Sequence, residues 1–130
     1  MNTYSQCLEQ TKNYIDAFNK QCLHCISDLL DEAIISSSQR REGVQVGKAC
    51  VLARVSKFWA RAEKFNKKLE AALGIIDLDD TPAHPCMVVF ANKKAIGVFV
   101  FEVGKAGKIY LLSSLRNKDF VKRARLTDKR

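Results

Sequence analysis

Residues 51–69 read VLARVSKFWARAEKFNKKL, and two periodic patterns overlap in this stretch. Its apolar residues recur at alternating steps of four and three, which places them on one face of an α-helix; they are Val51, Val55, Phe58, Ala62, Phe65 and Leu69. A second row keeps the same rhythm one position earlier and consists only of cations: Arg54, Lys57, Arg61, Lys64 and Lys68. The stretch therefore predicts an amphipathic helix whose apolar face is flanked by a positively charged stripe.

This helix is predicted over residues 45–74, with Gly74 just after its last turn, where glycine is favoured. An earlier helix is predicted over residues 4–35, because apolar residues there recur every seven positions: Leu8, Ile15, Cys22 and Leu29. A polar stretch at 36–43 separates the two segments, and Gly43 within it disfavours a helix that would continue across it. Two long helices joined by a short polar loop predict an antiparallel helical hairpin.

After a Pro-containing loop at 77–85, the apolar period changes from helical to extended. Three segments rich in Val, Ile, Phe and Tyr predict a three-stranded antiparallel β-meander over residues 86–112. In the central strand, Val98 and Val100 point to one face while Phe99 and Phe101 point to the other. A sheet with one wet face would alternate apolar and polar residues, so we expect both faces to be covered, with a homodimer as one way to do so.

Residues 117–130 predict a short basic C-terminal segment that ends the chain. The expected fold class is therefore α+β, with the helical hairpin, the meander and this segment forming a single domain over residues 1–130.

Composition limits the classes of partner and compartment. The chain has 22 Lys and Arg residues against 14 acids, a net charge of +8, which favours nucleic acid, an anionic membrane surface or an acidic protein as partner. Five cysteines, an odd number without the spacing of a small secreted domain, predict reduced thiols and a cytoplasmic location. Neither a signal peptide nor a membrane-spanning segment is expected, so a membrane is not among the predicted partners.

The function predicted from the cationic stripe is nucleic-acid binding by a small accessory or regulatory protein. A row of cations one helical turn apart suits the closely spaced phosphates of a DNA or RNA backbone. The predicted contact residues are Arg54, Lys57, Arg61, Lys64, Lys68, Lys122, Arg123 and Arg125. The stripe could also be neutralised by the acids Asp28, Asp31 and Glu32 of the first helix, or form a solvated surface.

The alternative function is a non-enzymatic adaptor or inhibitor that docks an acidic or other protein through the helical seam or a sheet edge. Attachment to anionic lipid is weaker, because no apolar insertion face lies beside the cations.

Four motifs in the sequence resemble metal, redox, phosphate-binding or catalytic sites, but each departs from the pattern that such a site needs. Zinc ligation by Cys22, Cys25, His84 and Cys86 would need pairs much closer in sequence. A redox C-x-x-C normally opens a helix that follows a strand, whereas Cys22 and Cys25 are expected inside a helix. The glycines at 43–47 do not form a complete phosphate loop. The acids Asp77, Asp79, Asp80 and Glu102 near Lys105 fit capping better than a nuclease centre. The sequence thus predicts no catalytic residue, metal or cofactor, and no enzyme.

Overall fold

The computed structural model describes residues 3–38, 44–78, 81–115 and 122–127. In chain order the elements are α1 (Thr3–Asn19), α2 (Leu23–Leu29), β1 (Leu30–Ser38), β2 (Val44–Val46), α3 (Lys48–Lys64), β3 (Leu69–Leu78), β4 (Thr81–Ala91), β5 (Lys94–Val103), β6 (Ile109–Leu115) and β7 (Arg125–Leu126). The strands form one sheet in the order β2-β1-β6-β5-β4-β3-β7. It is a mixed sheet, because β1 and β6 pair in parallel and the other neighbours pair antiparallel.

The predicted fold, a helical hairpin followed by a three-stranded meander, is wrong. The chain is α+β, but the described residues form three helices and a seven-stranded mixed sheet. The segments predicted as the meander are present as β4, β5 and β6, in the middle of this larger sheet. Both predicted long helices stop early, and the chain that follows each of them becomes a strand.

The first predicted helix, residues 4–35, ends at Asn19 because the chain turns back at Gln21. Gln21 has a left-handed backbone with a φ of 54°. Its N–H donates to the Phe18 carbonyl at 3.1 Å, and the Cys22 N–H donates to the Ala17 carbonyl at 3.0 Å. These two bonds form the Schellman arrangement that ends a helix. The chain then forms the short helix α2 and continues as β1, which pairs with β6.

The second predicted helix, residues 45–74, ends by the same geometry at Lys64. Asn66 is left-handed with a φ of 55°, a conformation that asparagine tolerates better than most residues. The Asn66 N–H donates to the Glu63 carbonyl, and the Lys67 N–H donates to the Ala62 carbonyl at 2.7 Å. Asparagine therefore fills the helix-ending role that was predicted for Gly74.

Gly74 itself lies in the middle of β3, paired with Cys86 of β4 and Leu126 of β7. A Cβ atom at this position would lie 2.9 Å from the Arg125 carbonyl oxygen and 3.1 Å from a methyl carbon of Val88. Glycine is needed here because two other parts of the chain approach the backbone closely. The predicted loop at 77–85 is largely occupied by the adjoining ends of β3 and β4.

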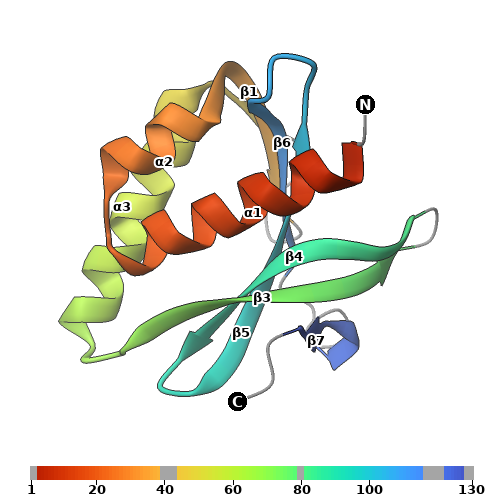
Figure 1. Ribbon diagram of the computed structural model, residues 1–130. Helices are drawn as coiled ribbons and strands as arrows, with labels where there is room; N and C mark the ends of the chain where they lie inside the picture. The colour runs from red at the N-terminus through yellow and green to blue at the C-terminus, as the bar shows by residue number, and fades with distance from the viewer. Residues whose placement is uncertain (1–2, 39–43, 79–80, 116–121, 128–130) are drawn as a thin grey trace.

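The helices lie on one face of the sheet, with α1 crossing it and α2 beside α3 (Figure 1). The larger apolar cluster fills this interface. It combines residues of all three helices, such as Tyr14, Ile26 and Val55, with sheet residues such as Met87 and Phe101. The ring centroids of Tyr14 and Phe101 are 4.6 Å apart, which places α1 directly over β5.

A smaller apolar cluster lies on the opposite face of the sheet and includes Ile76, Cys86, Val98 and Val100, with Ala124 packed against it. Both faces of β5 are thus buried, since Val98 and Phe101 each have 0% exposure. Of the predicted basic segment 117–130, only residues 122–127 lie in the described part of the chain; there, Arg125 and Leu126 pair with β3. Among the described residues no helix is long and apolar enough to cross a membrane.

The close packing at Gly74 gives a stability prediction. Gly74→Ala should lower the free energy of unfolding by about 1–3 kcal/mol, as expected for overpacking a tight site. Gly104→Ala is the matched control, because its Cβ would meet only Tyr110 at 3.4 Å, an ordinary contact, and the Lys108 carbonyl oxygen at 3.9 Å. Urea denaturation of both variants measures the difference. Equal stability of the two variants would contradict the strand position of Gly74.

Candidate functional site

A half-buried arginine reaches from α3 onto the helix-covered face of the sheet. Arg54 Nη1 donates a hydrogen bond to Ser36 Oγ on β1 at 3.1 Å and lies 3.5 Å from Gln45 Oε1 on β2. Ser36 is almost fully buried, with 1% exposure. The sequence produces this arrangement because Arg54 flanks the buried residues Val51 and Val55, so its side chain leaves α3 at the boundary of the apolar face. A positive charge is thereby held at the edge of the apolar interior.

Ser114 of β6 adds a second buried hydroxyl near this charge. It lies two residues along β6 from Leu112, the register partner of Ser36, and opposite Phe99 of β5. Its exposure is 1%, and its Oγ has no hydrogen-bond partner among the described residues. A buried hydroxyl without a partner destabilises a protein by about 1–3 kcal/mol, so such a group calls for a physical reason.

Tyr14 supplies a phenol on the α1 side of the same interior, with 2% exposure. Burial raises the pKa of this phenol, and the positive charge of Arg54 opposes part of the rise. The group is therefore a neutral hydroxyl at physiological pH. Together with Arg54, Ser36 and Ser114 it makes a set of polar groups rich in hydrogen-bond donors, within the electrostatic reach of one cation.

Other buried polar groups of the interior have structural roles. Thr11 donates to the Cys7 carbonyl at 2.7 Å, and the Cys7 thiol donates to the Phe101 carbonyl at 3.0 Å. The Trp59 Nε1–H has no partner among the described residues. However, Trp59 packs edge-on against Phe18 at 5.7 Å, and a five-residue separation places it on the other flank of α3 from Arg54. Trp59 therefore does not belong to the polar set.

The described part of the chain places no carboxylate and no imidazole in this interior. Its buried polar side chains are Thr11, Ser36 and Ser114. Of the described carboxylates, Glu102 is exposed and Asp77 lies at the end of β3, where the Ala83 N–H and Arg125 hold the pKa of its carboxyl below the usual value. The arrangement suits binding of an oxygen-bearing group, because its polar groups can donate hydrogen bonds to such an oxygen.

A surface groove of about 320 Å³ lies where α1 meets β3, lined by Lys12, Asn13, Ile15, Asp16, Asn19 and Leu73. Asn19, which lines this groove, holds two elements of the fold together. The Asn19 amide donates to the Ala71 carbonyl at 2.9 Å and accepts from the Ala71 N–H at 2.8 Å, which joins α1 to β3. Asp16 is paired with Lys20 at 3.2 Å. Two of the polar residues that line the groove are therefore already engaged within the protein.

The predicted cationic row is not a continuous stripe. Arg54 is turned toward Ser36, and Lys68 lies beyond the end of α3, where its backbone N–H donates to Asn92 Oδ1. Lys57, Arg61 and Lys64 remain exposed on α3, and the last two each lie within 6 Å of the Phe65 ring, at 5.9 and 5.8 Å.

The C-terminal cations lie elsewhere. Lys122 is exposed, whereas Arg123 donates to the Asp77 carbonyl and Arg125 pairs with the Asp77 carboxylate at 3.4 Å. Of the acids predicted to neutralise the row, Glu32 pairs with Lys48, a cation outside the row, at 3.2 Å.

The cysteines and histidines do not converge on one centre. Cys86 is buried in the outer cluster of the sheet, and His84 pairs with Ile76 on that same part of β4. Cys22, His24 and Cys25 are the one group of three potential metal ligands among the described residues. Cys22 and Cys25 form a disulfide, and Cys7, Cys50 and Cys86 are free. The prediction that all five thiols are reduced is therefore wrong for this pair.

Comparison with protein-family profiles finds no match for this sequence, and comparison with curated proteins finds none either. Solved structures do match. A SnoaL-like protein of unknown function from Burkholderia thailandensis has a TM-score of 0.65 and 16% identity, over 88% of this chain and 97% of that one. The fold is SnoaL-like.

Two further structures support this assignment of the fold. Bal32a, from a soil-derived mobile gene cassette, has a TM-score of 0.67 and 17% identity, over 94% of this chain and 97% of its own. An LEH-like epoxide hydrolase of Mycobacterium tuberculosis has a TM-score of 0.58 and 11% identity, over 94% of each chain. The fold of this chain thus resembles both that of a protein described as an enzyme and that of a protein of unknown function.

These findings correct the predicted function. Nucleic-acid binding by an accessory protein is wrong, because the fold resembles that of SnoaL-like and hydrolase-like structures and the eight predicted cations do not form one continuous row. The alternative, an adaptor or inhibitor docking through the helical seam or a sheet edge, is contradicted along with it: the solved structures that match are SnoaL-like and hydrolase-like proteins, and the predicted seam is interrupted because α1 ends at Asn19. The SnoaL-like fold resembles that of enzymes, but a fold by itself does not assign an activity.

Sequence reasoning missed Tyr14, Ser36, Gln45 and Ser114. Ser36 was assigned to a polar break between helices, although Ile34 and Ser36 share a strand face and Ile35 points the other way. That alternation was the available signal. Arg54 is among the residues predicted from the sequence, but as a nucleic-acid contact on the surface and not as a residue that faces the sheet.

The unpartnered hydroxyl gives a stability prediction. Ser114→Ala should leave the free energy of unfolding unchanged or raise it by about 1 kcal/mol, because it removes a buried hydroxyl that has no partner in the described part of the chain. Ser36→Ala should lower the same quantity by about 1–2 kcal/mol, because it removes the acceptor of a charged donor. Chemical denaturation compares the two variants. A loss for Ser114→Ala as large as that for Ser36→Ala would show that the Ser114 hydroxyl is already bonded.

Proposed function

We propose that this protein binds a small, largely apolar molecule that carries a carboxylate or carbonyl oxygen, with the oxygen held by Arg54 between α3 and the helix-covered face of the sheet. The observation that carries the proposal is the hydrogen bond that the Arg54 guanidinium donates to the buried hydroxyl of Ser36. Charge-assisted hydrogen bonds from arginine are strong and suit planar oxygen groups.

The side chains beneath the helices next to Arg54 are apolar. The larger cluster there is made of aliphatic and aromatic side chains, including Val55, Phe101 and Leu112. Ligand sites are typically apolar with a few placed polar groups. Ser114 and Tyr14 would then supply additional hydrogen-bond donors, and an oxygen atom near Ser114 would satisfy a hydroxyl that otherwise has no partner among the described residues.

The proposal is one of binding rather than of acid–base catalysis. Proton transfer needs a group whose pKa lies near the operating pH. Among the described residues, the buried polar side chains include no carboxylate and no imidazole, and burial moves the pKa of Tyr14 away from neutrality. The likeness to an epoxide hydrolase structure supports a small-molecule ligand, because the same fold serves that protein.

Two matched probes test the charge at the site. 2-Naphthoate and 2-naphthalenemethanol have the same ring system and differ in their charge. We expect the carboxylate to bind the wild-type protein about tenfold or more tightly than the alcohol, since a hydrogen bond to a charged group contributes about 1.5–3 kcal/mol. Trp59 is the single tryptophan of the chain and lies on α3, so its fluorescence reports binding.

Arg54→Met should abolish the preference for the carboxylate while leaving the affinity for the alcohol nearly unchanged. Arg61→Met is the matched control, because Arg61 is an exposed arginine on the same helix; it should keep the preference. Equal affinity of the wild-type protein for both probes, or an equal loss in both variants, would contradict the proposal.

A further inference from the structure

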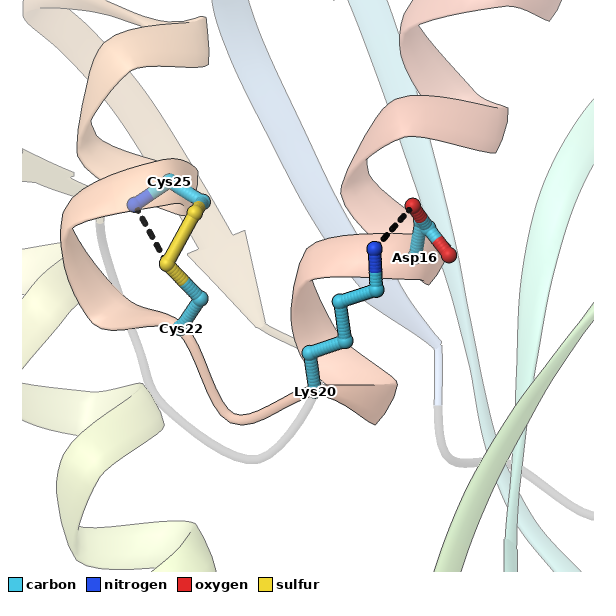
Figure 2. A network of polar contacts seen from close by, with 4 residues as sticks. All are labelled: Asp16, Lys20, Cys22 and Cys25. Atoms are coloured by element: carbon cyan, nitrogen blue, oxygen red, sulfur yellow. Dashed lines mark hydrogen bonds and ion pairs between the residues drawn. A yellow bond between two sulfur atoms is a disulfide. The ribbon is translucent and has the colours of Figure 1, made fainter.

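The two bonded cysteines occupy the first turn of α2, next to the chain reversal at Gln21. Cys22 is the N-cap residue of α2, and Cys25 lies in its first turn. Their Cα atoms are 5.2 Å apart and their sulfur atoms are bonded (Figure 2). The C-x-x-C therefore opens a helix and does not lie inside a long one, although the element before it is the helix α1 and not a strand. The left-handed Gln21 ends α1 and places the motif at the start of a new helix.

Two groups lie close to the sulfur of Cys22 and would favour its thiolate. The backbone N–H of Cys25 donates to Cys22 Sγ at 3.3 Å, and His24 Nδ1 lies 3.6 Å from the same sulfur. Lys20 is turned away toward Asp16, with which it forms an ion pair at 3.2 Å (Figure 2). Donated hydrogen bonds and a neighbouring imidazolium stabilise a thiolate, which is the reactive form of a cysteine.

The pair is partly exposed, unlike two of the three other cysteines. Cys22 and Cys25 are half-buried. Cys7 and Cys86 are buried, and burial raises the pKa of the Cys86 thiol to about 12. Cys50 is half-buried on α3 and is not in a disulfide. A thiol reagent can thus reach Cys22, Cys25 and Cys50, which makes Cys50 an internal reference.

Stabilisation of the fold does not account for this disulfide. A disulfide acts mainly by restricting the unfolded chain, and the effect grows with the length of the loop that it closes. Cys22 and Cys25 are separated by only three positions, so the loop is very short. In addition, α1, α2 and α3 are held together by the larger apolar cluster, in which Ile26 of α2 is fully buried. A chemical role accounts for the pair better.

We propose that Cys22 and Cys25 form a redox-active pair that exchanges reversibly with external disulfides of the glutathione class. In the reduced protein, the Cys22 thiolate attacks one sulfur of the external disulfide, forms a mixed disulfide and releases one external thiolate. The Cys25 thiolate then attacks Cys22 Sγ, forms the intramolecular disulfide and releases the second external thiolate. The protein gives up two electrons and two protons, and the external disulfide becomes two thiols. Excess reduced glutathione drives the reverse reaction.

The first experiment follows the wild-type protein and requires no substitution. The full chain is equilibrated with mixtures of reduced and oxidised glutathione, quenched with acid, alkylated and analysed by mass spectrometry after proteolysis. We expect the peptide with Cys22 and Cys25 to convert reversibly between dithiol and disulfide, with the same midpoint from either direction, while Cys7 and Cys86 stay reduced. A pair that stays reduced at every ratio, or that oxidises only irreversibly, would overturn the proposal.

The second experiment identifies the attacking sulfur. In Cys25→Ser the resolving thiol is absent, so oxidised glutathione should leave a mixed disulfide on Cys22, formed about tenfold or more faster than on Cys50 because a stabilised thiolate reacts faster. In Cys22→Ser the remaining Cys25 should react no faster than Cys50.

His24→Ala, made in the Cys25→Ser background, should slow the reaction of Cys22 several-fold and leave Cys50 unchanged. Equal rates at Cys22 and Cys50 in Cys25→Ser would contradict the assigned role of Cys22. Neither experiment uses the ligand proposed for Arg54, so the two proposals fail or succeed separately.

Discussion

The contact between Tyr14 of α1 and Phe101 of β5 fixes how the helices lie on the sheet. Phe101 sits on a central strand and is fully buried, so whatever covers it forms the centre of the interior. Tyr14 covers it at a centroid distance of 4.6 Å, and the same cluster brings in α2 and α3. Aromatic pairs of this kind bury large apolar areas and contribute beyond that area. The position of Arg54 over β1 follows from this packing, because α3 shares the interface with α1 and α2.

Two left-handed residues decide where the chain changes from helix to strand. Gln21 and Asn66 each end a helix with the same pair of backbone hydrogen bonds. The first reversal leads through α2 into β1, which carries Ser36. The second leads into β3, whose pairing with β4 and β7 requires glycine at position 74. Neither residue is a glycine or a proline, so a search for the strongest helix-ending residues passes over both of them.

Polar groups buried in the interior lower the stability of the protein. An apolar residue in place of Ser114 would fit the surrounding cluster without an unpaired hydroxyl, and a cation at the edge of an apolar layer is costly to desolvate. Such costs in natural proteins are concentrated at functional sites. Arg54 is hydrogen-bonded to Ser36 on the helix-covered face of the sheet, and Ser114 of the neighbouring strand β6 lies on the same face.

Periodicity along the chain was enough to predict the helix at α3, the strands β4, β5 and β6, the burial of both faces of β5, and the placement of cations beside an apolar face. Neighbouring residues set these local patterns. Long-range packing made strands of residues 30–38 and 69–78, because their hydrogen-bond partners in β6 and β4 come from distant or later parts of the chain. Packing also turned Arg54 toward the interior and left Lys57 and Arg61 facing solvent. A residue at the boundary of an amphipathic face can point either to the interior or to solvent. For Arg54 the strand packed beneath the helix, which carries Ser36, determines that the side chain points to the interior.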